Sequence, residues 1–221
     1  MEKMNGSYPL YKAKTYGATP VSSDEKVKML RSEGSDVNVV DLKEENFNGV
    51  SGHRRTSMKV LVAYMSQTGN TKKVAEAIFD VIPEPKEIKR VQDVKSLEGY
   101  DLTFLGFPIQ GSGPNKQAKS YLGKLTKGKT IALFITHAAP ENAPEMPESI
   151  QKFRDAATEA KIIGVFDCQG QLSGMVKTFM RFSPDRQLRE WARIDNSKGQ
   201  PDAARLERAI AFAHEVMNVH S

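Results

Sequence analysis

The sequence is poor in residues that build covalent or metal-centred scaffolds. Its 221 residues include one cysteine and one tryptophan. The single cysteine, Cys168, excludes an internal disulfide framework and any zinc or iron–sulfur site made from several cysteines of this chain. We therefore predict no metal site. The same scarcity favours a reducing, cytoplasmic environment.

Long apolar runs and concentrated charge are also missing. No stretch approaches the roughly 18 uncharged apolar residues that a membrane-spanning helix needs. The first 25 residues lack the apolar segment and cleavage site of a secretory signal. The 32 Lys and Arg residues and 27 Asp and Glu residues give a net charge of +5, with no basic tail. We expect a cytoplasmic protein that binds neither membranes nor nucleic acid.

Residues 1–57 differ from the remainder of the chain. They are rich in scattered Gly, Pro, Ser and Thr, and they predict only a short helix over 24–33 and a short strand over 37–42. Such a segment is too small to hold a core of its own. We interpret it as a partly disordered extension of a domain that spans 58–221. It is either a dispensable or untranslated leader, or a segment that docks on a partner.

From Met58 onward, strand and helix patterns alternate. The predicted strands cover 59–64, 86–91, 101–106, 129–136 and 162–168, and the predicted helices cover 70–82, 115–125, 146–160 and 202–218. Parallel strands need helical crossovers, so this alternation predicts a parallel sheet with helices on both faces. Ligands of such sheets bind at the carboxyl ends of the strands. The loops to consider are therefore 65–71, 107–114, 137–145 and 169–174.

The first of these loops reads Ser66-Gln67-Thr68-Gly69-Asn70-Thr71. It lies between a strand and a helix, where free amides and the helix dipole favour an anion. The loop contains no lysine and no Gly-x-x-x-x-Gly-Lys, which disfavours a nucleoside triphosphate, and no Gly-x-Gly-x-x-Gly, which disfavours a dinucleotide. A terminal phosphate monoester, bound without a cationic side chain, is the favoured ligand. The alternative is a plain turn whose Ser and Thr side chains merely cap the helix.

In this context, Ser-x-Thr-Gly-Asn-Thr resembles the FMN-phosphate loop of flavodoxins. The resemblance implies a doubly wound five-stranded sheet in the order 2-1-3-4-5 and one noncovalent FMN, with its phosphate on residues 66–71. The tripeptides Thr136-His137-Ala138 and Cys168-Gln169-Gly170 resemble a group of short flavodoxin-like proteins. That group includes the flavodoxin-like subunit associated with bilirubin reductase.

The resemblance also places the flavin ring between the loops that follow the third and fourth strands. The candidate residues there are Phe107, Pro108, Ile109, Gln110, Gly111, Thr136, His137 and Ala138. His137 is a candidate donor of a proton or hydrogen bond to the flavin. Neither loop holds the Trp or Tyr that often covers the ring in flavodoxins, since the only tryptophan is Trp191. One face of the ring is thus expected to be open. No catalytic residue is assigned.

Two further features have a structural and a functional interpretation. Cys168 ends the last predicted strand, where it is either a redox group or, as we favour, an inert core residue. Gln169 and Gly170 beside it are candidates to line the pocket. Basic residues interleave with aromatic residues between 179 and 193. That stretch is either a docking segment for a partner or an acidic cofactor or, as we favour, a packed helix with a solvated face.

The leading functional hypothesis is an FMN-binding electron-transfer protein, more an electron carrier than an enzyme. It would exchange electrons with a redox partner such as a ferredoxin or a reductase, as a monomer or a homodimer. One alternative is an FMN-dependent reductase of a quinone or a tetrapyrrole, which would act on a small-molecule substrate. The other is a flavin-free binding module on a flavodoxin scaffold, because fold alone does not establish function.

Overall fold

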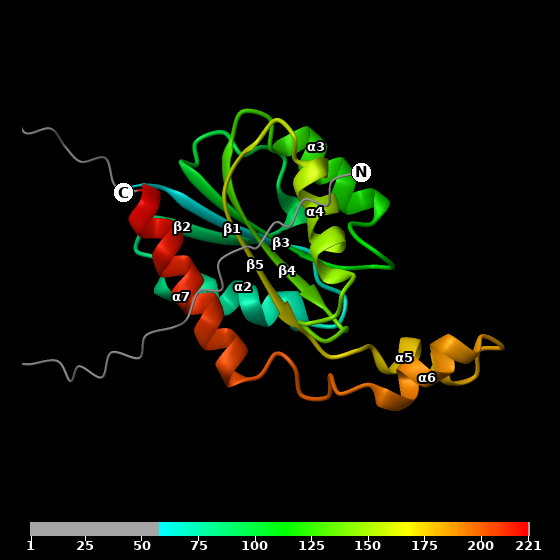
Figure 1. Ribbon diagram of the computed structural model, residues 1–221. Coiled ribbons are helices and arrows are strands. Elements are labelled where there is room, and N and C mark those ends of the chain that lie inside the picture. Colours follow the sequence, from blue (N-terminus) through cyan, green and yellow to red (C-terminus); the bar gives the residue numbers. More distant parts are fainter. Residues whose placement is uncertain (1–57, 221) are drawn as a thin grey trace, which may run out of the picture. The chain divides into compact units, whose positions relative to one another are not determined.

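The computed structural model describes residues 58–220 (Figure 1). The helix expected over 24–33 and the strand expected over 37–42 lie outside the described residues. The boundary proposed between the extension and the domain therefore stays a prediction.

One sheet of five parallel strands forms the centre of the described domain. The strands are β1 (Val60–Tyr64), β2 (Lys86–Arg90), β3 (Leu102–Pro108), β4 (Thr130–His137) and β5 (Lys161–Gln169). Their spatial order is β2-β1-β3-β4-β5. The predicted fold class and strand order are confirmed, and each strand lies within two residues of its expected range.

Helices connect the strands and extend the domain beyond β5. They are α2 (Asn70–Val81), α3 (Lys116–Leu125), α4 (Met146–Ala156), α5 (Gly174–Arg181), α6 (Arg186–Ile194) and α7 (Ala203–His220), with a short 3-10 turn η1 (Val91–Asp93). Helix α4 ends four residues before the expected position. The amides of Ala157 and Ala160 bond to the carbonyls of Arg154 and Ala157, and these tight turns lead the chain into β5.

Side chains alternate across the sheet and form two cores, one on each face. Val60 and Val62 of β1 pack with residues of α2 and α7 in one core. Leu61 and Ala63 pack with residues of α3 and α4 in the other core. Helices thus cover both faces, which explains why the strands read as near-continuous apolar runs in the sequence.

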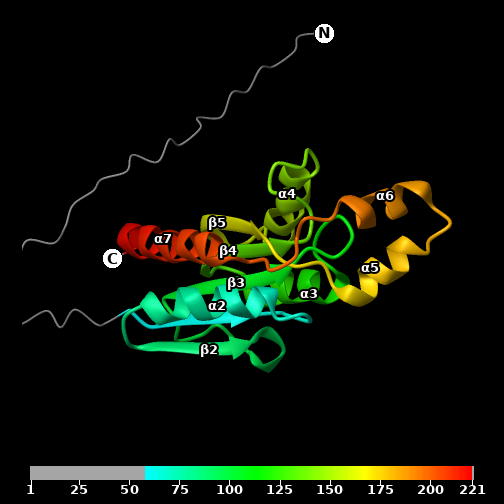
Figure 2. The ribbon, with the colours of Figure 1, turned by 90° about the horizontal axis from the view of Figure 1, so that it is seen from below.

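Because all five strands are parallel, their carboxyl ends meet at one edge of the sheet. From β1 the chain crosses to β2 on one side of β1 and then to β3 on the other side. This reversal of strand order is the switch point, and open α/β sheets bind ligands there, at the carboxyl edge. Helices α5 and α6 project beyond that edge (Figure 2). Within residues 58–220, no helix has the length and apolar character required to cross a bilayer.

Candidate functional site

The loop between β1 and α2 presents free backbone amides at the carboxyl edge of the sheet. Gly69 has φ 92°, a left-handed conformation that glycine adopts without strain, and its amide donates to Ser66 Oγ over 3.1 Å. The amides of Thr68, Asn70 and Thr71 make no hydrogen bond to any other described residue. No side chain caps α2, so the interpretation of this loop as a simple helix cap is not supported. Residues 66–71, which we call the anion cradle, are therefore a candidate anion-binding site.

Two side chains of this cradle anchor it to the neighbouring strands. Thr71 Oγ1 and Thr136 Oγ1 lie 2.8 Å apart and are buried, which ties the start of α2 to the end of β4. Asn70 donates from Nδ2 to the carbonyl of Gln171 over 2.8 Å. A Cβ at Gly170 would lie 2.8 Å from the Asn70 side chain, so this close approach requires glycine. Both Asn70 and Thr71 therefore hold the loop in place while their amides stay free.

A cavity of about 240 Å³ lies beside the cradle, on the side of β2. Its lining comprises Tyr64, Ser66, Gln67, Gly69, Lys72, Arg90 and Gln92. The pairing of β1 with β2 sets Tyr64 opposite Arg90 at the carboxyl edge. The loop itself contains no cation, as the sequence shows, but the fold brings Lys72 and Arg90 next to it. Sequence reasoning missed both, and the only signal for Arg90 was its place at the end of a predicted strand.

The loop after β3 is held in shape by its own polar groups. Ile109 donates its amide to the carbonyl of Thr136 over 2.8 Å, which joins this loop to the end of β4. Gly111 has φ 71°, and Gln110 closes the turn through its amide and through its side chain, which accepts from Asn115 Nδ2 over 2.6 Å. Asn115 also caps α3. The turn therefore holds fixed peptide groups at the edge of the sheet.

The aromatic residue of that loop points away from the edge. Phe107 is fully buried and packs against Phe153 of α4, with ring centroids 6.1 Å apart. Its side chain cannot stack on a ligand, so any contact at this position would come from its backbone. Pro108 and Ile109 are half-buried beside it.

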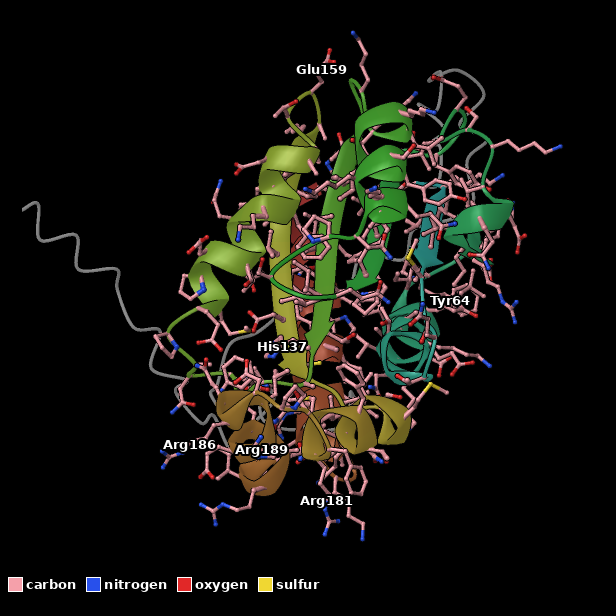
Figure 3. The ribbon with its side chains drawn as sticks, turned by 90° about the vertical axis from the view of Figure 1, so that its right-hand side faces the viewer. Tyr64, His137, Glu159, Arg181, Arg186 and Arg189 are labelled. Carbon is pink, nitrogen blue, oxygen red and sulfur yellow. The ribbon has the colours of Figure 1, made fainter. Side chains whose placement is uncertain are left out.

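His137 is also turned into the protein. Its Nδ1 lies 2.8 Å from the carbonyl oxygen of Ala139 and its Nε2 lies 3.1 Å from Asp167 Oδ2. The imidazole is buried, and both ring nitrogens face acceptors of the protein. His137 therefore has no N–H left for a ligand and instead orients the loop after β4. In Figure 3, His137 and Tyr64 lie toward the end of the sheet that carries α5 and α6, and Glu159 lies at the opposite end.

Glu141 fastens the same loop to α7. Its Oε1 accepts hydrogen bonds from Arg205 Nε at 2.8 Å and Arg208 at 2.6 Å, and from the amide of Gln169 at 3.2 Å. Burial opposes ionisation of Glu141, but the bonds from Arg208 and Gln169 outweigh it and lower the pKa of the carboxyl. The loop is thus held by a charged group that stays ionised at neutral pH.

Cys168 has the inert role favoured from sequence. It is fully buried, and burial raises the pKa of its thiol to about 12, so the reactive thiolate is absent at neutral pH. The neighbouring Gln169 is buried and donates to Ala138 O and Asn196 Oδ1 over 3.0 and 2.8 Å. Its side chain thus links the loop after β4 to the segment between α6 and α7 and is not free to contact a ligand. No group of three or more potential metal ligands occurs within residues 58–220.

The predicted site residues lie at one edge of the sheet, but some of their side chains are exposed there and others are buried. Ser66, Gln67, Thr68 and Gly69 are exposed or half-exposed around the cradle. Thr71, Phe107, Thr136 and His137 are buried and act as supports. The donor set of free amides, a hydroxyl-rich loop and a neighbouring Arg90 fits a phosphate monoester. These features define a doubly wound α/β domain whose loop at the switch point is a candidate anion-binding site.

Comparison with known proteins gives the family. A family model described as a flavodoxin domain matches residues 61–214. The flavodoxin-like domain-containing protein BilS of Clostridioides difficile (strain CD3) is 34% identical over 171 residues, which covers 72% of this chain and 97% of that protein. The chain belongs to the flavodoxin family.

Solved structures are similar at lower identity. Oxidised flavodoxin 2 from Bacillus cereus is 18% identical with a TM-score of 0.47, and the alignment covers 73% of this chain and 99% of that one. A mutant Fusobacterium nucleatum flavodoxin bound to flavin mononucleotide is 13% identical with a TM-score of 0.47, over 73% of this chain and 96% of that one. The family assignment rests on the family model and on BilS.

Proposed function

We propose that this protein binds FMN noncovalently and carries electrons, singly or in pairs, between redox partners. The observation that supports this most is the anion cradle, in which the amides of Thr68, Asn70 and Thr71 lack partners among the described residues. FMN ends in a phosphate monoester, the ligand that such a donor set suits. When bound, FMN supplies one- and two-electron chemistry, while the protein supplies binding, orientation and electrostatics.

The residues of this chain have distinct roles in that proposal. Thr68, Asn70 and Thr71 would hold the phosphate through their free amides, with the Ser66 hydroxyl as a further donor. Arg90 lines the adjoining cavity and adds positive charge near the phosphate without entering the loop. The fixed peptide groups of the turn at Gly111 would face the flavin ring and orient it.

The direct test is FMN affinity after a charge is placed in the cradle. Thr68 is exposed, so Thr68→Glu should leave the fold intact while its carboxylate repels the phosphate. This repulsion weakens the charge-assisted hydrogen bonds to the phosphate and predicts about 10- to 100-fold weaker FMN binding, measured by quenching of flavin fluorescence. Riboflavin, which lacks the phosphate, should be affected far less.

The matched control is Ser120→Glu on the exposed surface of α3, which makes the same charge change away from the cradle. It should leave FMN affinity unchanged. Equal FMN affinity in Thr68→Glu and the wild type would overturn the proposed phosphate site. A purified protein that fails to bind added FMN would overturn the function itself and favour a flavin-free binding module.

A second candidate function is an FMN-dependent reductase of a quinone or a tetrapyrrole. It is favoured by the burial of Phe107 and His137, because neither ring loop then offers an aromatic side chain to cover the flavin. A flat substrate would then stack on the uncovered face of the flavin. Repeated turnover of menadione or bilirubin by the FMN-loaded, reductant-supplied protein would support the reductase. Stoichiometric electron exchange without turnover would support the carrier.

A further inference from the structure

Helices α5 and α6 and the four residues between them form an arm beyond the carboxyl edge of the sheet (Figure 2). We call residues 174–194 the arm. Within residues 58–220, six of the seven exposed large hydrophobic residues lie on this arm. They are Met175, Val176, Phe179, Phe182, Trp191 and Ile194, and the seventh is Val219. Phe179 is 70% exposed and Phe182 is 79% exposed. Such a concentration differs from the scattered apolar residues of ordinary surfaces and marks an interaction site.

The same arm carries an excess of positive charge. It has five Lys or Arg residues and two Asp or Glu residues, a net charge of +3. Lys177 and Arg193 are neutralised by ion pairs with Asp195 and Glu190. Arg181 and Arg186 are exposed and form no ion pair with any described residue. Figure 3 shows Arg181 and Arg186 pointing outward, away from the sheet.

The arm is fixed at its base and so presents a preformed surface. Leu172 donates its amide to Ser197 Oγ over 2.8 Å, and Gln171 donates its amide to the carbonyl of Gln200 over 3.0 Å. The carbonyl of Gln171 accepts from Asn70 of the cradle over 2.8 Å. The stem of the arm is thus bonded to the anion cradle, which keeps the arm beside the candidate cofactor site.

We propose that the arm is the docking surface for an acidic electron-carrier protein. Phe179, Phe182 and Trp191 would form the apolar centre of the interface, and Arg181 and Arg186 would pair with carboxylates at its rim. The partner would therefore carry an apolar patch ringed by Asp and Glu. This inference rests on the proposed function, because it assigns the partner chemistry to that same edge of the domain.

The charges of the arm favour an acidic protein over the other possible occupants. Two copies of this chain would bring two arms together that each keep a net charge of +2 when Asp195, the partner of Lys177, is counted, and this opposes self-association. An anionic bilayer would attract Arg181 and Arg186, but it would also face the exposed carboxylates of Asp185 and Glu190. A folded protein can instead place carboxylates opposite the arginines and basic or neutral groups opposite Asp185 and Glu190.

The experiment measures the binding of an acidic plant-type [2Fe–2S] ferredoxin, in its oxidised form, to the full 221-residue chain by biolayer interferometry. The double variant Arg181→Glu/Arg186→Glu should weaken binding by about tenfold or more and reduce its salt dependence. Phe179→Ser/Phe182→Ser should weaken it by about tenfold with the salt dependence kept. The matched control Lys124→Glu/Lys161→Glu changes the same charge at exposed sites away from the arm and should leave binding within about twofold.

Several outcomes would overturn the inference: no binding by the wild type, arm variants that bind as the wild type does, or an equal loss in the control. Binding to phosphatidylglycerol vesicles that needs Arg181 and Arg186, without ferredoxin binding, would assign the arm to membranes instead. A dimer in sedimentation that Phe179→Ser/Phe182→Ser dissociates would assign it to a second copy.

FMN affinity is measured on the same proteins to separate this inference from the proposed function. Arm variants that keep FMN affinity but lose ferredoxin affinity support the docking surface. Normal FMN binding with arm variants that bind ferredoxin as the wild type does would overturn the docking surface alone. A wild type that binds no FMN would overturn the proposed function, whatever the ferredoxin result.

Discussion

Helix α4 and the α5–α6 arm both show apolar residues at helical spacing, but only α4 packs against the sheet. Helix α4 buries Met146, Ser149 and Phe153. Helix α6 buries only Ala192, and α5 buries no residue. A helical apolar stripe therefore predicts a helix without predicting what covers the stripe. In α4 the sheet covers the stripe, whereas in the arm Phe179, Phe182 and Trp191 stay exposed although α5 and α6 contact each other.

The largest difference between the two regions should appear when one phenylalanine is truncated in each. Phe153→Ala removes a fully buried ring and is expected to lower the free energy of unfolding by about 3–5 kcal/mol. Phe179→Ala removes an exposed ring and should change it by less than about 0.5 kcal/mol. Urea unfolding followed by circular dichroism measures both. Similar losses in the two variants would mean that the arm packs against the domain in solution.

Smaller changes in stability, of opposite sign in the two regions, are expected when a glycine is replaced by alanine. A Cβ at Gly106 of β3 would lie 2.0 Å from the ring of Phe134, so Gly106→Ala should destabilise by about 1–3 kcal/mol or more through overpacking. A Cβ at Gly174, the first residue of α5, meets nothing within 4 Å. Gly174→Ala should be neutral or stabilise by up to about 1 kcal/mol. Thermal unfolding of the two variants tests the contrast.

The smallest expected effect is the pH dependence of the arm's stability, which Asp195 at the end of the arm controls. Burial raises the pKa of Asp195, but hydrogen bonds from Lys177 and Ser197 outweigh burial and lower it. A carboxyl whose pKa is lowered by folding stabilises the native state above its unfolded pKa of about 3.9, and the contribution fades as the pH falls through the folded pKa. Asp195→Asn should therefore loosen the arm at neutral pH, and the difference from wild type should disappear at acidic pH.

The only tryptophan of the chain, Trp191, lies on α6 and reports on the arm, while circular dichroism reports mainly on the sheet and its helices. Asp195→Asn should shift the urea midpoint of Trp191 fluorescence and leave the midpoint by circular dichroism almost unchanged. Glu190→Gln is the control, because its partner Arg193 is exposed and the pair should contribute little. Coincident shifts of both probes would show that arm and sheet unfold as one unit.

The strands and most helices were predictable because their signals are local. Buried parallel strands read as apolar runs, and the helices between them repeat apolar residues at 3.6-residue spacing. The position of the candidate site followed from the same reasoning, since parallel strands bring their carboxyl ends together. The arm was expected to be a packed helix, and this was wrong. The exposure of Phe179, Phe182 and Trp191 depends on the absence of a covering surface, which no spacing reveals.

The sequence by itself determined the alternation of strands and helices and the polar, glycine-containing loop after β1, because each depends on neighbours within a few residues. The parallel sheet followed from that alternation, since parallel strands need helical crossovers. Only the tertiary structure decided that Phe107 and His137 turn inward, that Arg90 stands opposite Tyr64, and that the arm leaves its apolar residues exposed. Those outcomes depend on strand register and on packing between residues far apart in the chain. Contacts of that kind leave no periodic trace in the sequence.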